Sequence, residues 1–269
     1  EIQCNGGANG EITMNVSGGV SPYSYDIDGS SNPSNVFDLL NANTYVVTAT
    51  DDNGCNTSET VTMTEPSTSV TSSYTQSDYN GVGVSCNGDL DGSIDLTVTG
   101  GILPYTFSWT GSIVSSLEDL SLIGAGTYNV TATDDNGCFT TETVVVTEPV
   151  LYTSSYTQSS YNGYGVSCNG STDGNIDVTV NGGTFPYSYS WGSGQITEDL
   201  SNIGVGTYVL TSSDVNGCST SETVIITEPA TVISSYSTTD WNGFEIQCNG
   251  GANGEITMNV SGGVSPYSY

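Results

Sequence analysis

Apolar and polar residues alternate over short stretches of the chain, and glycine-containing turns separate these stretches. Val, Ile, Tyr and Thr gather in the alternating runs, such as 94–98 and 126–133, with Asn-Gly, Asp-Gly or Gly-Gly pairs between them. This pattern is typical of short strands joined by tight turns, and no stretch shows a convincing helical period. The sequence therefore predicts an all-β protein.

The same motifs return at intervals of 80 to 83 residues. Cys-Asn-Gly begins at Cys4, Cys86, Cys168 and Cys248. Asn-Gly-Cys ends at Cys55, Cys138 and Cys218, and Thr-Glu-Pro ends at Pro66, Pro149 and Pro229. A unit of about 82 residues suits a β-sandwich domain. We expect an extended rod of tandem Ig-like sandwiches, each adding roughly 35–45 Å because a ten-residue strand spans about 34 Å.

The motifs predict complete domains at 67–149 and 150–229, a first domain at 1–66 that is truncated at its N-terminal end, and a C-terminally truncated domain at 230–269. Residues 1–25 are identical to residues 245–269, so a super-repeat of 244 residues restarts at Glu245. The window opens just before a cysteine and closes inside a predicted strand. This leads to the hypothesis that the chain is a segment of a much longer tandem array, such as a native fibre.

The charge of the chain excludes several classes of function. It carries 29 carboxylates and no lysine, arginine or histidine, for a net charge of −29. No cationic side chain is present to contact nucleic-acid phosphates or an anionic membrane. Without histidine there is no Ser-His-Asp or Cys-His catalysis. No apolar run reaches 18 residues, so no membrane insertion of this segment is expected.

Each repeat contains two cysteines, and we expect a disulfide within each domain. The pairs Cys4–Cys55, Cys86–Cys138 and Cys168–Cys218 would close loops of 50 to 52 residues, each contributing roughly 4 kcal/mol. Cys248 would then pair with a cysteine of the next repeat. The alternative pairs Cys55–Cys86, Cys138–Cys168 and Cys218–Cys248 across domain boundaries. Disulfides imply an oxidising, extracellular location.

Aromatic residues recur at fixed places in the repeats. Tyr45, Tyr128 and Tyr208 each stand ten residues before the second cysteine of their domain. This placement predicts a tyrosine corner, in which the hydroxyl holds a backbone turn. Trp109 and Trp191 are expected in the core, with sugar stacking as the alternative.

The carboxylates raise the question of a metal site or a catalytic pair. Asp89 and Asp91, and Asp134 with Asp135 and Asn136, could gather around calcium, which prefers oxygen ligands. Asp51 and Asp52 repeat the second cluster, but Val215 replaces its second aspartate in the third domain. This drift favours turn residues, so no metal site is assigned and calcium is the one cofactor considered. The same drift argues against a paired-carboxylate glycosidase, and we expect no enzyme activity.

The repeat motifs together resemble the SprB repeat. In the second repeat they read Ser85-Cys86-Asn87-Gly88, Asp91-Gly92-Ser93-Ile94, Gly100-Gly101, Pro104-Tyr105-Thr106-Phe107-Ser108-Trp109, Gly126-Thr127-Tyr128 and Asp134-Asp135-Asn136-Gly137-Cys138. The later motifs also resemble PKD-type domains. The first domain departs from the pattern, with Ile27 in place of the tryptophan and Asn43 in place of the glycine before Thr-Tyr. The resemblance implies very large cell-surface adhesins of Bacteroidota, exported by the type IX secretion system and involved in gliding motility.

These observations predict a stalk or fibre outside a bacterial cell that projects a binding surface. Its first partners would be the neighbouring repeats of the same chain. Two alternatives stay open. One is a self-assembling fibre in which chains share strands. The other is a module that binds glycans or the substratum through exposed aromatic residues, namely Tyr74, Tyr79, Tyr156, Tyr161, Tyr236 and Trp241.

Overall fold

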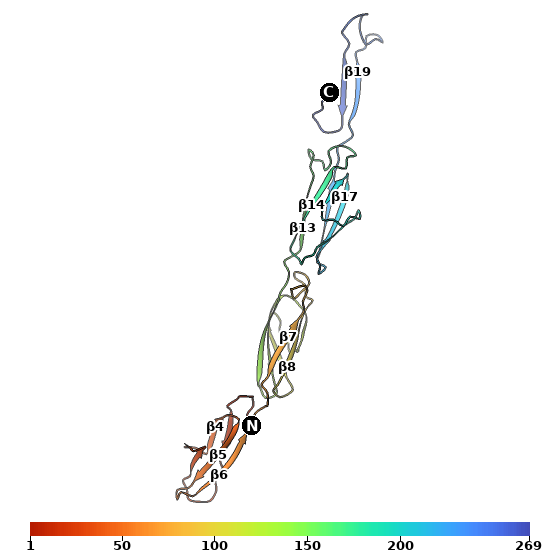
Figure 1. Ribbon diagram of the computed structural model, residues 1–269. Helices are drawn as coiled ribbons and strands as arrows, with labels where there is room; N and C mark the ends of the chain where they lie inside the picture. Colours follow the sequence, from red (N-terminus) through yellow and green to blue (C-terminus); the bar gives the residue numbers. More distant parts are fainter. The chain divides into compact units, whose positions relative to one another are not determined.

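The computed structural model describes residues 1–269, and strands are its only regular secondary structure (Figure 1). No helix is present that could cross a membrane. The chain forms two compact units. The first contains Glu1–Val84 and Gly88–Glu148, and the second contains Ser85–Asn87 and Pro149–Tyr269. The tripeptide Ser85–Asn87 thus belongs to the second unit, although the residues on both sides of it belong to the first.

The first unit contains two β-sandwiches. The first sandwich (residues 1–66) comprises β1 (Gly10–Thr13), β2 (Ser24–Ile27), β3 (Ser30–Asn32), β4 (Val36–Leu40), β5 (Asn43–Thr50) and β6 (Asn56–Met63). Its two sheets have the orders β1-β4 and β3-β2-β5-β6. The second sandwich (residues 67–149) comprises β7 (Thr71–Gln76), β8 (Gly92–Thr99), β9 (Thr106–Gly111), β10 (Leu120–Ile123), β11 (Gly126–Thr133) and β12 (Phe139–Val146). Its sheets have the orders β10-β8-β7 and β12-β11-β9.

The second unit repeats this plan. The third sandwich (residues 150–229) comprises β13 (Thr153–Gln158), β14 (Gly174–Asn181), β15 (Ser188–Trp191), β16 (Leu200–Ile203), β17 (Gly206–Ser213) and β18 (Ser219–Ile226). Its sheets have the orders β13-β14-β16 and β15-β17-β18. The chain continues into a two-stranded sheet of β19 (Ile233–Thr238) and β20 (Ile256–Ser261).

The alternation of apolar residues accounts for the cores. In β8, Ile94 and Leu96 are buried while Asp95 and Thr97 are exposed, as the period of two along a strand requires. Trp109 is fully buried and its indole N–H donates to the Leu117 carbonyl at 2.9 Å. Trp191 is buried in the third sandwich and donates in the same way to Thr197. Both tryptophans therefore lie in the core, as the sequence predicts.

A tyrosine hydroxyl holds one turn in each of the three sandwiches. Tyr128 donates to the Gly124 carbonyl at 2.8 Å. Tyr45 and Tyr208 donate to the carbonyls of Asn41 and Gly204, at 3.0 Å in both cases. Each bond spans four residues and closes the turn before the strand that carries the tyrosine. This is the tyrosine-corner arrangement that the sequence predicts.

The two cysteines of a sandwich lie at opposite ends of its last strand. In the first sandwich, the Ile2 N–H donates to the carbonyl of Thr64, which follows β6, whereas Cys55 precedes β6. Eight residues of strand span about 27 Å. In the third sandwich, Val166 bonds to Thr227 after β18 in the same way, and Cys218 precedes β18. This arrangement decides which cysteines can meet.

Candidate functional site: the disulfide-linked junction

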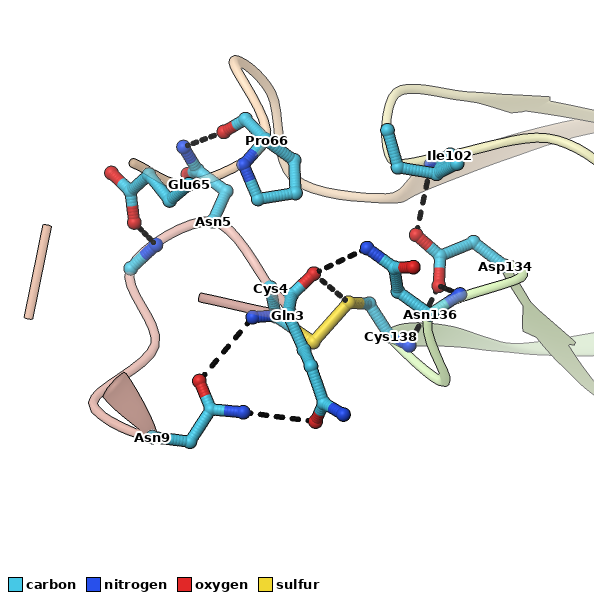
Figure 2. Close-up of a disulfide and its surroundings, with 11 residues drawn as sticks. Gln3, Cys4, Asn5, Asn9, Glu65, Pro66, Ile102, Asp134, Asn136 and Cys138 are labelled. Atoms are coloured by element: carbon cyan, nitrogen blue, oxygen red, sulfur yellow. Dashed lines mark hydrogen bonds between the residues drawn. A yellow bond between two sulfur atoms is a disulfide. The ribbon is translucent and has the colours of Figure 1, made fainter. Parts of the chain in front are cut away.

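The site that recurs in this chain is the junction between successive repeats. In the first unit it consists of the Cys4-Asn5-Gly6 loop, the Glu65-Pro66 connection and the turn at residues 134–138. The Asn5 side-chain amide donates to the Pro66 carbonyl at 2.9 Å, and the Gly6 N–H donates to the Glu65 carboxylate at 2.5 Å (Figure 2). The first sandwich thus holds its cysteine loop against its own exit segment.

The opposite side of the junction is a turn organised by one aspartate. Asp134 is only 5% exposed. Its carboxylate accepts the backbone N–H groups of Ile102 at 2.9 Å, Asn136 at 3.0 Å and Cys138 at 2.8 Å (Figure 2). Three such bonds satisfy a buried carboxylate that has no cation near it. They also set the position of the cysteine that follows the turn.

A disulfide joins the two sides. Cys4 and Cys138 are bonded, with their Cα atoms 5.6 Å apart, across a sequence separation of 134 residues. The Asn136 side-chain amide adds a hydrogen bond of 3.0 Å to the Gln3 carbonyl beside the disulfide (Figure 2). The first and second sandwiches are therefore linked twice, by the backbone at Pro66 and by sulfur.

The same register appears in the second unit. Cys86 is bonded to Cys218, 132 residues further along, again with Cα atoms 5.6 Å apart. The Asn87 amide donates to the Pro149 carbonyl at 3.1 Å. Asp214 accepts the N–H groups of Thr184, Asn216 and Cys218 at 2.7 to 3.0 Å. Each loop cysteine thus bonds to the turn cysteine of the following repeat.

This register corrects the predicted pairing. The intradomain pairs Cys4–Cys55, Cys86–Cys138 and Cys168–Cys218 are wrong, because Cys4, Cys138, Cys86 and Cys218 have other partners and Cys55 and Cys168 are free. Disulfides need Cα atoms within about 7 Å, but the two cysteines of one sandwich are separated by the length of a strand.

The alternative pairs Cys55–Cys86, Cys138–Cys168 and Cys218–Cys248 are also wrong. Each of them contains Cys86, Cys138 or Cys218, and these three cysteines are bonded to other partners. These pairs would need the turn cysteine to lie beside the exit of its own sandwich. The structure places it at the entrance, eight residues of strand earlier.

The remaining cysteines, Cys55, Cys168 and Cys248, are free and exposed. The Cys55 turn is built like the bonded ones, because the Asp51 carboxylate accepts the N–H groups of Val20 at 3.0 Å and Cys55 at 2.8 Å. These bonds, first that from Val20, hold the pKa of the Asp51 carboxyl below its usual value. The predicted pairing of Cys248 with a further repeat stays a prediction.

The aspartates considered for calcium are placed differently. The Asp51 and Asp134 carboxylates accept backbone N–H groups and organise turns. Asp52 and Asp135 follow them as exposed turn residues, and Asp89 and Asp91 precede β8 in another segment. No group of three or more aspartate, glutamate or cysteine side chains is placed to hold a metal ion. The structure therefore gives Asp51 and Asp134 a role in turns.

A cavity of about 260 Å³ opens at the first junction. Its wall includes the disulfide, Pro66, Val70 and the exposed ring of Phe139. Phe139 directly follows the bonded Cys138, so the cavity is part of the junction.

The aromatic residues considered for glycan contact fall into two groups. The hydroxyls of Tyr79 and Tyr161 donate to the carbonyls of Asp91 and Asp173, both at 3.2 Å, and brace the loops before β8 and β14. Tyr161 is nevertheless 38% exposed. The second group is exposed as well, with Tyr74 on β7, Tyr156 on β13, Tyr236 on β19 and Trp241 after it.

Sequence reasoning missed the residues that surround the disulfides. Most of the junction asparagines and glutamates were used only as markers of the repeat, namely Asn5, Asn87, Asn216, Glu65 and Glu148, and Asn136 was considered only as a calcium ligand. The signal that could have found them is the joint recurrence of Cys-Asn-Gly with Thr-Glu-Pro. The Gly88 N–H donates to the Glu148 carboxylate at 2.7 Å, so the two motifs bind each other directly.

A comparison with protein families confirms the resemblance stated above. The SprB repeat matches residues 1–32, 82–112, 166–195 and 245–269, a little under half of the chain. Each matched segment starts at or shortly before a Cys-Asn-Gly loop. The matches, in an all-β chain of disulfide-linked repeats, support a repeat region of the surface-adhesin type.

Other comparisons are less informative. None of the curated proteins matches the chain. Among solved structures, the N-terminal eight Ig domains of Down Syndrome Cell Adhesion Molecule are 14% identical, with a TM-score of 0.37, over 82% of this chain and 35% of that one. An amphioxus IgVJ-C2 molecule is 14% identical, with a TM-score of 0.25, over 58% of this chain and 96% of that one. This chain spans about a third of the first structure, and neither overlap carries an argument.

Proposed function

We propose that this chain is a load-bearing part of an extracellular bacterial adhesin or filament, and that it acts by structure and without catalysis. The observation that carries the proposal is the Cys4–Cys138 disulfide, which ties the first sandwich to the second beside the Glu65-Pro66 connection. A folded module that only binds a ligand gains nothing from a second covalent link to its neighbour. A tether gains a second path for force.

The chemistry of the chain supports the same proposal. Disulfides persist in an oxidising environment, which favours a location outside the cell. The net charge of −29 makes neighbouring chains repel one another and so opposes lateral aggregation. At physiological salt this repulsion acts over about 8–10 Å. Without lysine or arginine the chain has no cleavage site for trypsin-like proteases. Export by the type IX system and a part in gliding rest on the SprB likeness alone.

The test is stretching of single molecules held at the two ends. With both disulfides closed, the shortest covalent path crosses from residue 4 to 138, returns along the chain to 86, crosses to 218 and continues to 269. The unfolded chain should therefore reach about 380 Å, at roughly 3.5 Å per extended residue. The reduced chain should reach about 940 Å, at roughly 3.5 Å per extended residue. An oxidised chain that extends to the reduced length would show that the disulfides carry no load.

Location is tested separately, with antibodies against residues 67–149 on intact cells. Labelling of threads that leave the cell surface is the expected result. Labelling that appears only after the cells are permeabilised would contradict the proposal.

A second candidate function is contact with surface glycans. It is favoured by Tyr74 and Tyr156, which stand at equivalent places on β7 and β13 and are 40% and 37% exposed. Aromatic faces of this kind stack on sugars. Binding on a glycan array that is lost in Tyr74→Ala/Tyr156→Ala would support this function. An array without binding by the wild-type chain would exclude it for the glycans tested.

A further inference from the structure

The second and third sandwiches carry the same tripeptide, Tyr-Asn-Gly, in a tight turn at residues 79–81 and 161–163. Asn80 and Asn162 have φ of +56° and +50°, and the glycines that follow them have φ of +97° and +93°. Positive φ at both central residues is the turn geometry that Asn-Gly favours. Both asparagines are exposed, and a Cβ on either glycine would meet no atom within 4 Å. The two turns are therefore matched in sequence, backbone conformation and exposure.

The turns differ in what binds the N–H group of the glycine. The Gly81 N–H donates to the Asp78 carboxylate at 2.6 Å. In the third sandwich Ser160 stands in the place of this aspartate. The Gly163 N–H donates to no atom of the protein. One carboxylate is thus the difference between two otherwise equivalent Asn-Gly pairs.

An asparagine that precedes glycine can lose its side-chain amide without an enzyme, and asparagine is among the thermolabile residues. The backbone nitrogen of the glycine attacks the asparagine Cγ, a bond forms between them, and the Cγ–Nδ2 bond breaks. Ammonia leaves with the proton of the backbone N–H, and a succinimide ring remains. One water molecule then opens the ring at either of its two carbonyl carbons, which gives aspartate or isoaspartate. Glycine favours the attack because it has no side chain to hinder the ring.

A hydrogen bond to a carboxylate opposes the first step of this reaction. The attacking nitrogen must give up its proton, but an anionic acceptor stabilises the N–H group and repels the negative charge that would form on the nitrogen. A tenfold change in rate corresponds to about 1.4 kcal/mol, close to the lower end of what hydrogen bonds to charged groups contribute. Asp78 should therefore slow the reaction at Asn80 by about tenfold or more.

We propose that Asn162 is a site of spontaneous deamidation, at which aspartate and isoaspartate accumulate as the protein ages. The equivalent Asn80 is protected by the hydrogen bond from the Gly81 N–H to Asp78. Each deamidation adds one negative charge to the turn, because a neutral amide becomes a carboxylate.

The isoaspartate product also changes the backbone of the turn. It adds one carbon atom to the chain between Tyr161 and Tyr164, whose backbone groups exchange hydrogen bonds of 2.7 and 3.1 Å. The Tyr161 hydroxyl donates to the Asp173 carbonyl at 3.2 Å, just before β14. Modification at Asn162 therefore acts on a turn that braces the loop leading into this strand.

The test is incubation of the full chain in mildly alkaline buffer. Samples taken over time are reduced and cut with a glutamate-specific protease, and fragmentation mass spectrometry locates aspartate and isoaspartate in the peptides. We expect conversion of Asn162 to be about tenfold faster than conversion of Asn80. Equal rates at the two asparagines would overturn the proposal.

Two exchanged variants test the role of the carboxylate. Asp78→Ser should accelerate deamidation of Asn80 by about tenfold, and Ser160→Asp should slow that of Asn162 by the same factor. Both substituted positions are exposed, so circular dichroism of the variants should match that of the wild type. An unchanged rate in either variant would contradict protection by the carboxylate.

The unfolded chain provides the last control. In concentrated urea the rates at Asn80 and Asn162 should become similar, because the two tripeptides are identical and no hydrogen bond then holds the Gly81 N–H. A difference of the original size that persists in urea would show that the folded turn is not its cause.

Discussion

The sulfur atoms of Cys4 and Cys138 are bonded although 134 residues separate them along the chain. Cys4 lies beside the segment by which the chain leaves the first sandwich, after β6. Cys138 directly precedes β12, the last strand of the second sandwich. The disulfide therefore belongs to the junction and to the core of neither sandwich. Hydrogen bonds from Asn5 and Asn136 flank it on both sides.

Cleavage inside the second sandwich should leave the two fragments joined, because the Cys4–Cys138 disulfide spans the cut. A site-specific protease sequence inserted between Asn80 and Gly81, in an exposed turn before β8, would cut the chain once. We expect both fragments to run as one band on a non-reducing gel, and as two bands after reduction. Fragments that separate without reductant would favour pairing within domains. The matched control is Cys4→Ser/Cys138→Ser, which should separate in both gels.

Loss of the first junction disulfide should lower stability. Cys4→Ser/Cys138→Ser removes a closed loop longer than 100 residues, and we expect a loss of about 2–5 kcal/mol in the free energy of unfolding. Urea denaturation followed by tryptophan fluorescence measures it. Cys55→Ser replaces a free, exposed thiol and should change the value by less than about 0.5 kcal/mol. Equal effects of the two changes would contradict the assigned pairing.

The Asp51 turn should respond to acid. Its carboxyl has a lowered pKa because backbone N–H groups, that of Val20 first, bond to the charged form. A pKa lower in the folded than in the unfolded state adds stability above the unfolded pKa of about 3.9, and that stability is lost as the pH falls through the folded pKa. Wild type should therefore exceed Asp51→Asn in stability at pH 7 and approach it below about pH 4.

Urea midpoints across this pH range test the Asp51 prediction. Asp52→Asn is the control, because the Asp52 carboxylate accepts none of the bonds that hold the turn. A constant difference between wild type and Asp51→Asn at all pH values would rule out the ionised carboxylate as the cause.

The tyrosine corner can be tested by removing one oxygen atom. Tyr128→Phe deletes the bond to the Gly124 carbonyl and should cost about 0.5–1.5 kcal/mol of unfolding free energy. Tyr156→Phe removes a hydroxyl from an exposed ring on β13 and should be nearly neutral. Chemical denaturation of both variants provides the measurement. An unchanged free energy of unfolding in Tyr128→Phe would show that the tyrosine-corner hydrogen bond does not stabilise the fold.

Gly100 should tolerate no side chain. Its φ is +82°, and a Cβ there would lie 2.0 Å from the Ser69 carbonyl oxygen. Gly137 has a similar φ of +86° but open space around it. We expect Gly100→Ala to lower the thermal midpoint clearly more than Gly137→Ala, which bears only the cost of the backbone conformation. Similar midpoints would show that the chain moves aside at Gly100.

Features with a local cause were predictable from the sequence. The alternation in β8 identified the buried Ile94 and Leu96, and the place of Tyr128 at the start of the penultimate strand identified the tyrosine corner. These depend on the period of a strand and on contacts a few residues apart. Each SprB match likewise contains one of the recurring Cys-Asn-Gly motifs.

The cysteine partners depend on the placement of whole sandwiches, and spacing along the chain does not encode it. One clue was nevertheless present. Cys55 and Thr64 stand at the two ends of a single alternating stretch, so the turn cysteine had to lie a strand's length from the exit of its own sandwich. The bond from Ile2 to Thr64 then places Cys4 at that exit. Only the tertiary structure supplies this second fact.

The two disulfides close loops that overlap, because the loop from Cys4 to Cys138 and the loop from Cys86 to Cys218 share residues 86–138. A single nick anywhere between residues 5 and 217 therefore falls inside at least one closed ring and releases no piece. Mechanical or enzymatic damage could therefore cut the backbone once without any loss of mass. Release of a fragment would require a second cut.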